Sequence, residues 1–273
     1  QDNKRLYAQT KFYEHFFESD PYGYPLSGTL EDIKKLTLSK LNSYYKKVFL
    51  KNAVRIVVNG RISNLDIVKI ESDLDLEREV KLNFETKFRA PREVKTIFEE
   101  TDMNQAILKL GYHFPIFRSD KAYDAAVILD TILGGSPNSR LFQEIREKQG
   151  LCYDIHLSYD YYKGVIMISS GVDIDNKEKA LESIQLLVEE MKKEGITEEE
   201  LRQAKIYYQH QIKNSLDSQS VLTKRAFIRD LLGYEESIEE RLAHIDQITV
   251  SDVNETLTKL TLDTIYVLFG GQS

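Results

Sequence analysis

A change between two hydrophobic periodicities is the feature that most limits the fold of this chain. From Gln105 to Phe114 every second residue is apolar on one face, which is the pattern of a β-strand. Residues 121–133 form a mostly apolar stretch of helical length, and residues 139–148 form a second, more polar helix. Gly150 follows that helix and is suited to end it. The segment therefore predicts a strand followed by two helices.

The next segment returns to strands and then to helices. Residues 151–159 and 164–172 read as two strands joined by a turn at 160–163. Residues 180–191 carry an apolar stripe at helical spacing. Thr197 and Glu200 have the spacing of a capping box, which begins a long helix. This order predicts an α+β fold in which helices pack on one face of a mainly antiparallel sheet.

Two segments of the chain have matching sequence patterns, which indicates an internal repeat. Ile33–Gly60 and Ile245–Gly271 each place an apolar residue before a threonine, continue as a helix and end in an apolar strand with glycine. If the repeat is real, its second copy ends a domain and its first copy ends an earlier one. We therefore expect residues 1–76 to be the last part of a preceding α+β domain whose start is missing. Residues 77–94 would be a charged linker, and residues 95–273 a complete domain.

Composition excludes several classes of function. The net charge is −7, and no basic cluster is present, so nucleic acid is not expected as a partner. No apolar run approaches the length of a membrane span, so no membrane partner is expected either. One cysteine among 273 residues excludes a disulfide framework and favours a reducing compartment. We therefore expect a cytoplasmic protein.

Catalytic groups are hard to find in the sequence. None of the five histidines lies in an HExxH or HxxEH motif. The nearest approach is His15 with Glu18, where Ser19 occupies the place of a second histidine, and a catalytic zinc needs three protein ligands. Cys152 is a candidate nucleophile, but its place in an apolar strand favours a packed thiol. We expect no catalytic residue, no metal ligand and no cofactor in this chain.

The octapeptide REKQGLCY offers one pair of candidate binding residues. Arg146 falls in the last turn of a predicted helix, and Tyr153 is the third residue after Gly150. A cation suits a helix C-terminus and tyrosine suits a strand, so both residues have a structural explanation. Alternatively, the guanidinium and the phenol converge on one side of the turn and donate hydrogen bonds to the carbonyl groups of an extended peptide.

The run from Ile128 to Ile155 resembles the second half of zinc peptidases of the insulinase–pitrilysin family, which includes the mitochondrial processing peptidases. The matching features are the LGG break, the SRLF after it, the RE-K-GL-Y block and the later YYKGVIMIS strand. The resemblance implies repeated α+β domains that face each other as a clamshell around peptide substrates. In such proteins one half carries an HxxEH zinc motif, and the other carries an arginine–tyrosine pair that holds substrate. Arg146 and Tyr153 match that pair.

The resemblance implies a non-catalytic, substrate-holding half of a zinc metallopeptidase. Zinc is expected only in a zinc-bearing homologous half or in a partner subunit, within a homodimer or heterodimer. The start of the chain, Asp2-Asn3-Lys4 with Tyr7-Ala8-Gln9, is similar to bacterial members that lack the zinc motif and are paired with a zinc-bearing relative. The alternative is an inactive scaffold or interaction protein that kept the fold and lost proteolysis.

Overall fold

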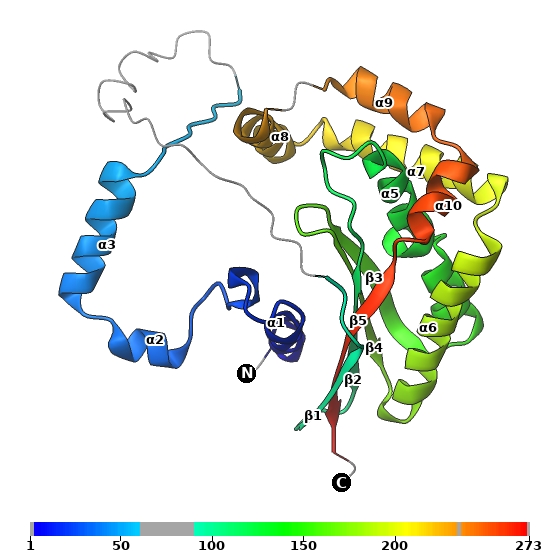
Figure 1. Cartoon of the computed structure of the whole chain (residues 1–273), viewed down its shortest axis with the longest axis horizontal. Helices are drawn as coiled ribbons and strands as arrows, with labels where there is room; N and C mark the ends of the chain where they lie inside the picture. The colour runs from blue at the N-terminus through cyan, green and yellow to red at the C-terminus, as the bar shows by residue number, and fades with distance from the viewer. Residues whose placement is uncertain (1–2, 61–89, 234–235, 272–273) are drawn as a thin grey trace. The chain divides into compact units, whose positions relative to one another are not determined.

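The computed structural model describes residues 3–60, 90–233 and 236–271 (Figure 1). The chain forms two compact units. Unit 1 consists of residues 1–26, 86–209 and 239–273, and unit 2 consists of residues 27–85 and 210–238. The charged linker expected at residues 77–94 lies outside the described residues up to residue 89. The division into an earlier domain, a linker and a complete domain stays a prediction.

Unit 1 is built on one five-stranded sheet, with strand order β1-β5-β2-β4-β3. Only β1 and β5 pair in parallel, and the other neighbours are antiparallel, as the sequence predicted. In this order β1 and β3 are the two edges. The strands are β1 (Lys95–Thr101), β2 (Ala106–His113), β3 (Cys152–Asp160), β4 (Val165–Val172) and β5 (Thr261–Gly270).

Most helices of unit 1 lie on one face of this sheet (Figure 1). Apolar side chains of β2, including Leu108 and Leu110, pack there against Ile128, Ile184 and Val253 in one large core. This layer confirms the predicted α+β architecture. Its helical elements are α5 (Tyr123–Asp130), the π-helical turns Thr131–Gly135 and Phe142–Lys148, the short 3₁₀ turn Ile174–Asn176, α6 (Lys177–Glu194), the first turns of α7 (Glu198–Ser215), α9 (Ile238–Gln247) and α10 (Val250–Leu257).

The opposite face of the sheet carries a single helix among the described residues, α1 (Lys4–Phe16), which is followed by a 3₁₀ turn at Pro21–Gly23. Phe12 and Phe16 are buried with Ile107 and Tyr266 in a second, smaller core cluster. Gly111 makes this packing possible, because a Cβ there would lie 2.5 Å from both phenylalanine rings. The expectation that helices cover only one face was therefore incomplete, since the sequence showed neither the amphipathic face of α1 nor its target.

Unit 2 contains α2 (Leu30–Lys35), α3 (Leu38–Lys51) and α8 (Gln219–Leu232). The segment after α3 is tied to α8 by two polar contacts. The guanidinium of Arg55 lies 3.0 Å from the carboxylate of Asp230, and the Asn59 amide donates to the Gln219 carbonyl at 3.1 Å. Within the described part of the chain, no helix combines the length and the apolar character needed to cross a bilayer.

The internal repeat is real in its helical half and fails in its strand half. Thr37 caps α3 by accepting the Lys40 N–H, and Thr249 caps α10 by accepting the Asp252 N–H, both at 3.2 Å. After α10 the chain enters β5 between two strand partners, whereas the described residues 53–60 form no strand. The prediction of a strand ending at Gly60 was wrong for this structure, because an isolated strand without a hydrogen-bonded neighbour is not stable.

Candidate functional site

The element that carries Arg146 is the π-helical segment Phe142–Lys148. Ile145 anchors it in the main core with no exposed surface, which leaves the next residue, Arg146, facing outward. The segment ends at Gly150, whose φ of +62° favours glycine. There the N–H groups of Gly150 and Leu151 donate to the carbonyls of Arg146 and Ile145 at 3.2 and 3.1 Å. The predicted glycine stop is confirmed.

The side chain of Arg146 is 40% exposed. Its guanidinium carbon lies 4.6 Å from the centre of the Phe142 ring, and its Nε lies 3.7 Å from a carboxylate oxygen of Glu147. A distance of 3.7 Å is too long for a good hydrogen bond, and a guanidinium has five N–H donors. Arg146 is therefore stacked on an aromatic ring and still presents donors to solvent.

Tyr153 lies at a β-bulge in the edge strand β3. Cys152 pairs with Val172 of β4, but the next pair joins Asp154 to Gly171, so Tyr153 is the extra residue between them. A bulge of this kind redirects the side chain and strengthens the local twist. The phenol of Tyr153 is consequently exposed by 53%, although both of its chain neighbours are more buried.

The hydroxyl of Tyr153 donates a hydrogen bond to the carboxylate of Asp173, the residue after β4. An ionised carboxylate can only accept, so the proton belongs to the phenol. This hydrogen bond raises the pKa of Tyr153 above its usual value. The expectation that Tyr153 donates to a peptide carbonyl needs revision for this state, because its proton is already held by Asp173.

Arg146 and Tyr153 thus stand on either side of the Gly150 turn and are both exposed, but their side chains contact different partners. Their joint role in holding a substrate stays a prediction. Asp173 was missed by the sequence analysis. Since the predicted β3–β4 hairpin brings residue 152 opposite residue 172, the residues just beyond that pair are expected neighbours, and this signal could have found Asp173.

His15 and Glu18 do not form a metal-binding arrangement. Glu18 accepts a hydrogen bond from Arg92 at 2.9 Å and lies 3.4 Å from the Lys95 ammonium. The His15 carbonyl accepts from Arg92 at 2.6 Å, and burial lowers the pKa of the His15 ring. Both residues help to attach the end of α1 to the segment that leads into β1.

Cys152 is a packed thiol. It is 9% exposed and belongs to the main core, and burial raises its pKa above the usual value. A raised pKa keeps the sulfur protonated near neutral pH, which disfavours nucleophilic attack. His156 follows in the same strand but is exposed, so it does not share the environment of the thiol. The structure favours the core reading of this residue.

Comparison with known proteins gives the family. The model described as "Peptidase M16 inactive domain" matches residues 35–208. Among curated relatives, a probable inactive metalloprotease of Bacillus subtilis, YmfF, is 27% identical over 98% of this chain and 64% of its own length. An uncharacterized zinc protease of the same organism, YmxG, is 29% identical over 85% of this chain and 57% of its own length. The chain therefore spans about three fifths of these relatives.

Solved structures show the same fold. A conserved protein from Enterococcus faecalis matches all of this chain and 65% of its own, with a TM-score of 0.90 and 26% identity. A peptidase M16 inactive domain from Pseudomonas fluorescens matches 98% of this chain and 66% of its own, with a TM-score of 0.77 and 19% identity. The resemblance drawn from the LGG, SRLF and RE-K-GL-Y motifs is confirmed: this chain belongs to the peptidase M16 inactive-domain family and is of its non-catalytic type.

Proposed function

We propose that this chain is the substrate-holding half of an insulinase-like zinc metallopeptidase. The observation that carries the proposal is the exposure of Arg146 and Tyr153 on the two sides of a rigid, glycine-terminated turn. A buried helix end and an edge strand fix the backbone positions of the two residues, while both polar groups remain accessible. An extended peptide offers alternating carbonyl and N–H groups, which such a pair can bind without reading sequence.

The two residues take complementary roles in this proposal. Arg146 donates from its guanidinium to a peptide carbonyl. Tyr153 keeps its own proton on Asp173 and accepts a peptide N–H with its oxygen lone pairs, because a phenol can donate and accept at once. The Asp173 hydrogen bond then fixes the orientation of the ring before substrate arrives.

Zinc enters the proposal only outside this chain. The pair His15 and Glu18 does not fit a catalytic zinc, since Glu18 is already engaged by Arg92 and Lys95. A zinc-bearing homologous half or partner subunit would supply the metal and activate water for peptide hydrolysis. We propose a cytoplasmic location on the strength of the single cysteine, which favours a reducing compartment.

An inactive scaffold is the second candidate function. Local contacts favour it, because Arg146 stacks on Phe142 and Tyr153 binds Asp173 without any ligand. If these contacts are the whole purpose of the two side chains, replacing them will lower stability and leave peptide binding unchanged. The two candidates therefore differ in a measurable way.

The test combines this chain with a zinc-bearing relative and measures cleavage of a fluorogenic peptide together with thermal unfolding. Arg146→Ala and Tyr153→Phe should each reduce cleavage by about one order of magnitude, the worth of a charge-assisted hydrogen bond, and leave the melting temperature nearly unchanged. Arg202→Ala and Tyr24→Phe are matched controls, because both residues are exposed elsewhere in unit 1. Lowered stability with normal cleavage would establish the scaffold role instead.

A further inference from the structure

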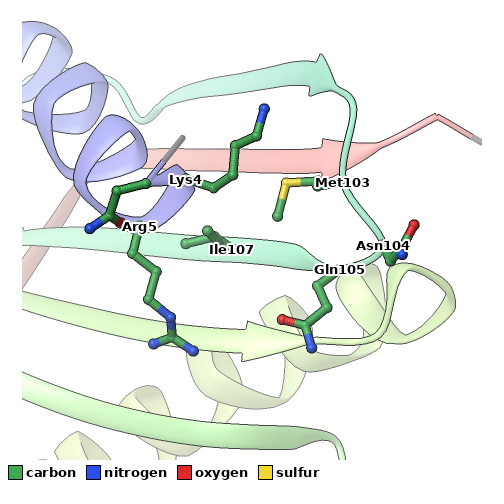
Figure 2. Close-up of a pocket in the computed structure, with 7 residues that line it drawn as sticks. Lys4, Arg5, Met103, Asn104, Gln105 and Ile107 are labelled. Atoms are coloured by element: carbon green, nitrogen blue, oxygen red, sulfur yellow. The ribbon is translucent and has the colours of Figure 1, made fainter. Parts of the chain in front are cut away.

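A cavity of about 660 Å³ opens at the end of the sheet where β2 begins. Figure 2 shows Lys4 and Arg5 reaching it from the first turn of α1, and Met103, Asn104 and Gln105 reaching it from the turn between β1 and β2. Ile107 of β2 also lines it. This volume falls within the range of small-ligand sites.

The walls of the cavity are positively charged although the whole chain carries −7. Lys4 and Arg5 contribute two cations, and none of the described residues that line the cavity carries a carboxylate. Asp102 belongs to the same turn but does not line it. The two amide side chains, Asn104 and Gln105, add neutral hydrogen-bond donors.

The two cations are engaged to different degrees. Arg5 binds both carboxylate oxygens of Asp154 on β3, at 2.5 and 2.9 Å, which lowers the pKa of Asp154. Lys4 donates to a neutral group, the Thr101 hydroxyl, at 2.9 Å. A hydroxyl does not neutralise an ammonium, so the charge of Lys4 remains available to an anion. Nearby Glu99 accepts the hydroxyls of two tyrosines, Tyr7 and Tyr266.

The cavity and Tyr153 occur at the same end of the sheet. Ala106, which follows Gln105, pairs with Val172 of β4, and Val172 pairs with Cys152 of β3. Two strand spacings of about 4.8 Å separate β2 from β3, so the two sites are roughly 10 Å apart. An extended peptide covers that distance in about three residues. The pair Arg5–Asp154 connects the two sites directly, because Asp154 follows Tyr153 in the chain.

We infer that this cavity is a subsite for a carboxylate of the bound peptide, about three residues away from the backbone group held by Tyr153. The ammonium of Lys4 attracts the carboxylate, the amides of Asn104 and Gln105 donate to it, and Met103 and Ile107 contact the methylene groups of a glutamate side chain. This inference rests on the proposed peptide-holding function and specifies its substrate class.

The test is fluorescence anisotropy on the 273-residue chain with a labelled peptide, Ser-Ala-Ala-Glu-Ala-Ala-Ser, whose ends are acetylated and amidated. A second peptide carries Gln in place of Glu. A third carries Gln and a free C-terminus, which distinguishes a terminal carboxylate from a side-chain carboxylate. We expect the Glu peptide to bind about tenfold more tightly than the first Gln peptide, and the preference to shrink in 0.5 M salt, as expected for a partly exposed charge contact.

Lys4→Gln should abolish the preference, whereas Lys11→Gln should retain it, because Lys11 lies two turns further along α1 and does not line the cavity. Asn104→Asp, at an exposed turn position, should also abolish it and serves if the Lys4 variant folds poorly. Tight binding of the free C-terminus would assign the subsite to a terminal carboxylate.

Equal affinity of all three peptides for the unmodified chain, or no binding of any, would overturn the subsite. The proposed function has a separate readout. Arg146→Ala should weaken the Glu and Gln peptides by the same factor, since it holds backbone. A loss of that effect with an intact Glu preference would reject the role of Arg146 and keep the subsite, and the reverse result would reject only the subsite.

Discussion

Tyr153 and Asp173 are joined by a hydrogen bond across the open end of the β3–β4 hairpin. The bulge at Tyr153 makes this possible, because it moves the phenol out of the regular alternation of the strand. Asp173 begins the turn that leads from β4 into the 3₁₀ segment before α6. The contact therefore connects an exposed candidate binding residue to the connection between sheet and helices.

Asp173→Asn should lower the pKa of Tyr153 toward its usual value. The carboxylate stabilises the protonated phenol, so removing the charge makes the phenol easier to ionise. A titration followed by NMR of labelled tyrosine measures the change. Asp175→Asn is the control, because this carboxylate is two residues away and should leave Tyr153 unaffected. A pKa that does not move in Asp173→Asn would mean that the hydrogen bond is absent in solution.

Local patterns in the sequence predicted the hairpin, the glycine stop and the apolar stripe of α6, since each depends on neighbouring residues. Longer-range features were missed. Strand β1 was not assigned, and its partner lies far away in sequence, with Lys95 opposite Thr264. The bulge at Tyr153 leaves no mark in composition. The cavity at Lys4 depends on α1 packing against a sheet whose first strand is 91 residues further on, which no local pattern reveals.

The repeat predicts opposite effects for two equivalent positions. Leu41 in α3 corresponds to Val253 in α10 when the capping threonines are aligned. Val253 is fully buried and Leu41 is 54% exposed. Val253→Asn should therefore lower the free energy of unfolding by roughly 2–4 kcal/mol through lost packing and a buried amide, whereas Leu41→Asn should change it by less than about 0.5 kcal/mol. Urea unfolding of both variants provides the measurement.

A large effect of Leu41→Asn would show that α3 has a buried apolar face in solution. That result would contradict the exposure seen here and would identify a covering layer equivalent to the one that buries Val253.

Gly111→Ala should destabilise the attachment of α1. A Cβ at this position would lie 2.5 Å from ring atoms of Phe12 and Phe16, so the helix or the rings must move. Overpacking of this kind costs about 1–3 kcal/mol. In a double-mutant cycle, Phe16→Leu should reduce the penalty of Gly111→Ala, because the smaller side chain leaves room for the methyl group. An additive cycle measured by thermal unfolding would show that the two residues do not meet.

Asp130 should make the stability of the chain depend on pH. This carboxyl is at the end of α5, and burial raises its pKa from 3.8 to about 7. Between these values the folded state keeps a proton that the unfolded state has lost, so the free energy of unfolding falls as pH rises from about 4 to 7. The difference across this window can reach roughly 4 kcal/mol if no other group compensates. Below pH 4 both states are protonated and the effect disappears.

Asp130→Asn provides the matched comparison, because an amide has nearly the same shape and no charge to bury. Urea unfolding at intervals from pH 4 to 8 should show a decline in the unmodified chain that is largely absent in the variant. Other titrating groups contribute equally to both curves, so the difference between the curves isolates Asp130. At pH 7.5 the variant should be the more stable protein, since it avoids an ionised carboxylate in a buried position. Parallel curves over the whole range would show that Asp130 ionises as readily in the folded chain as in the unfolded one.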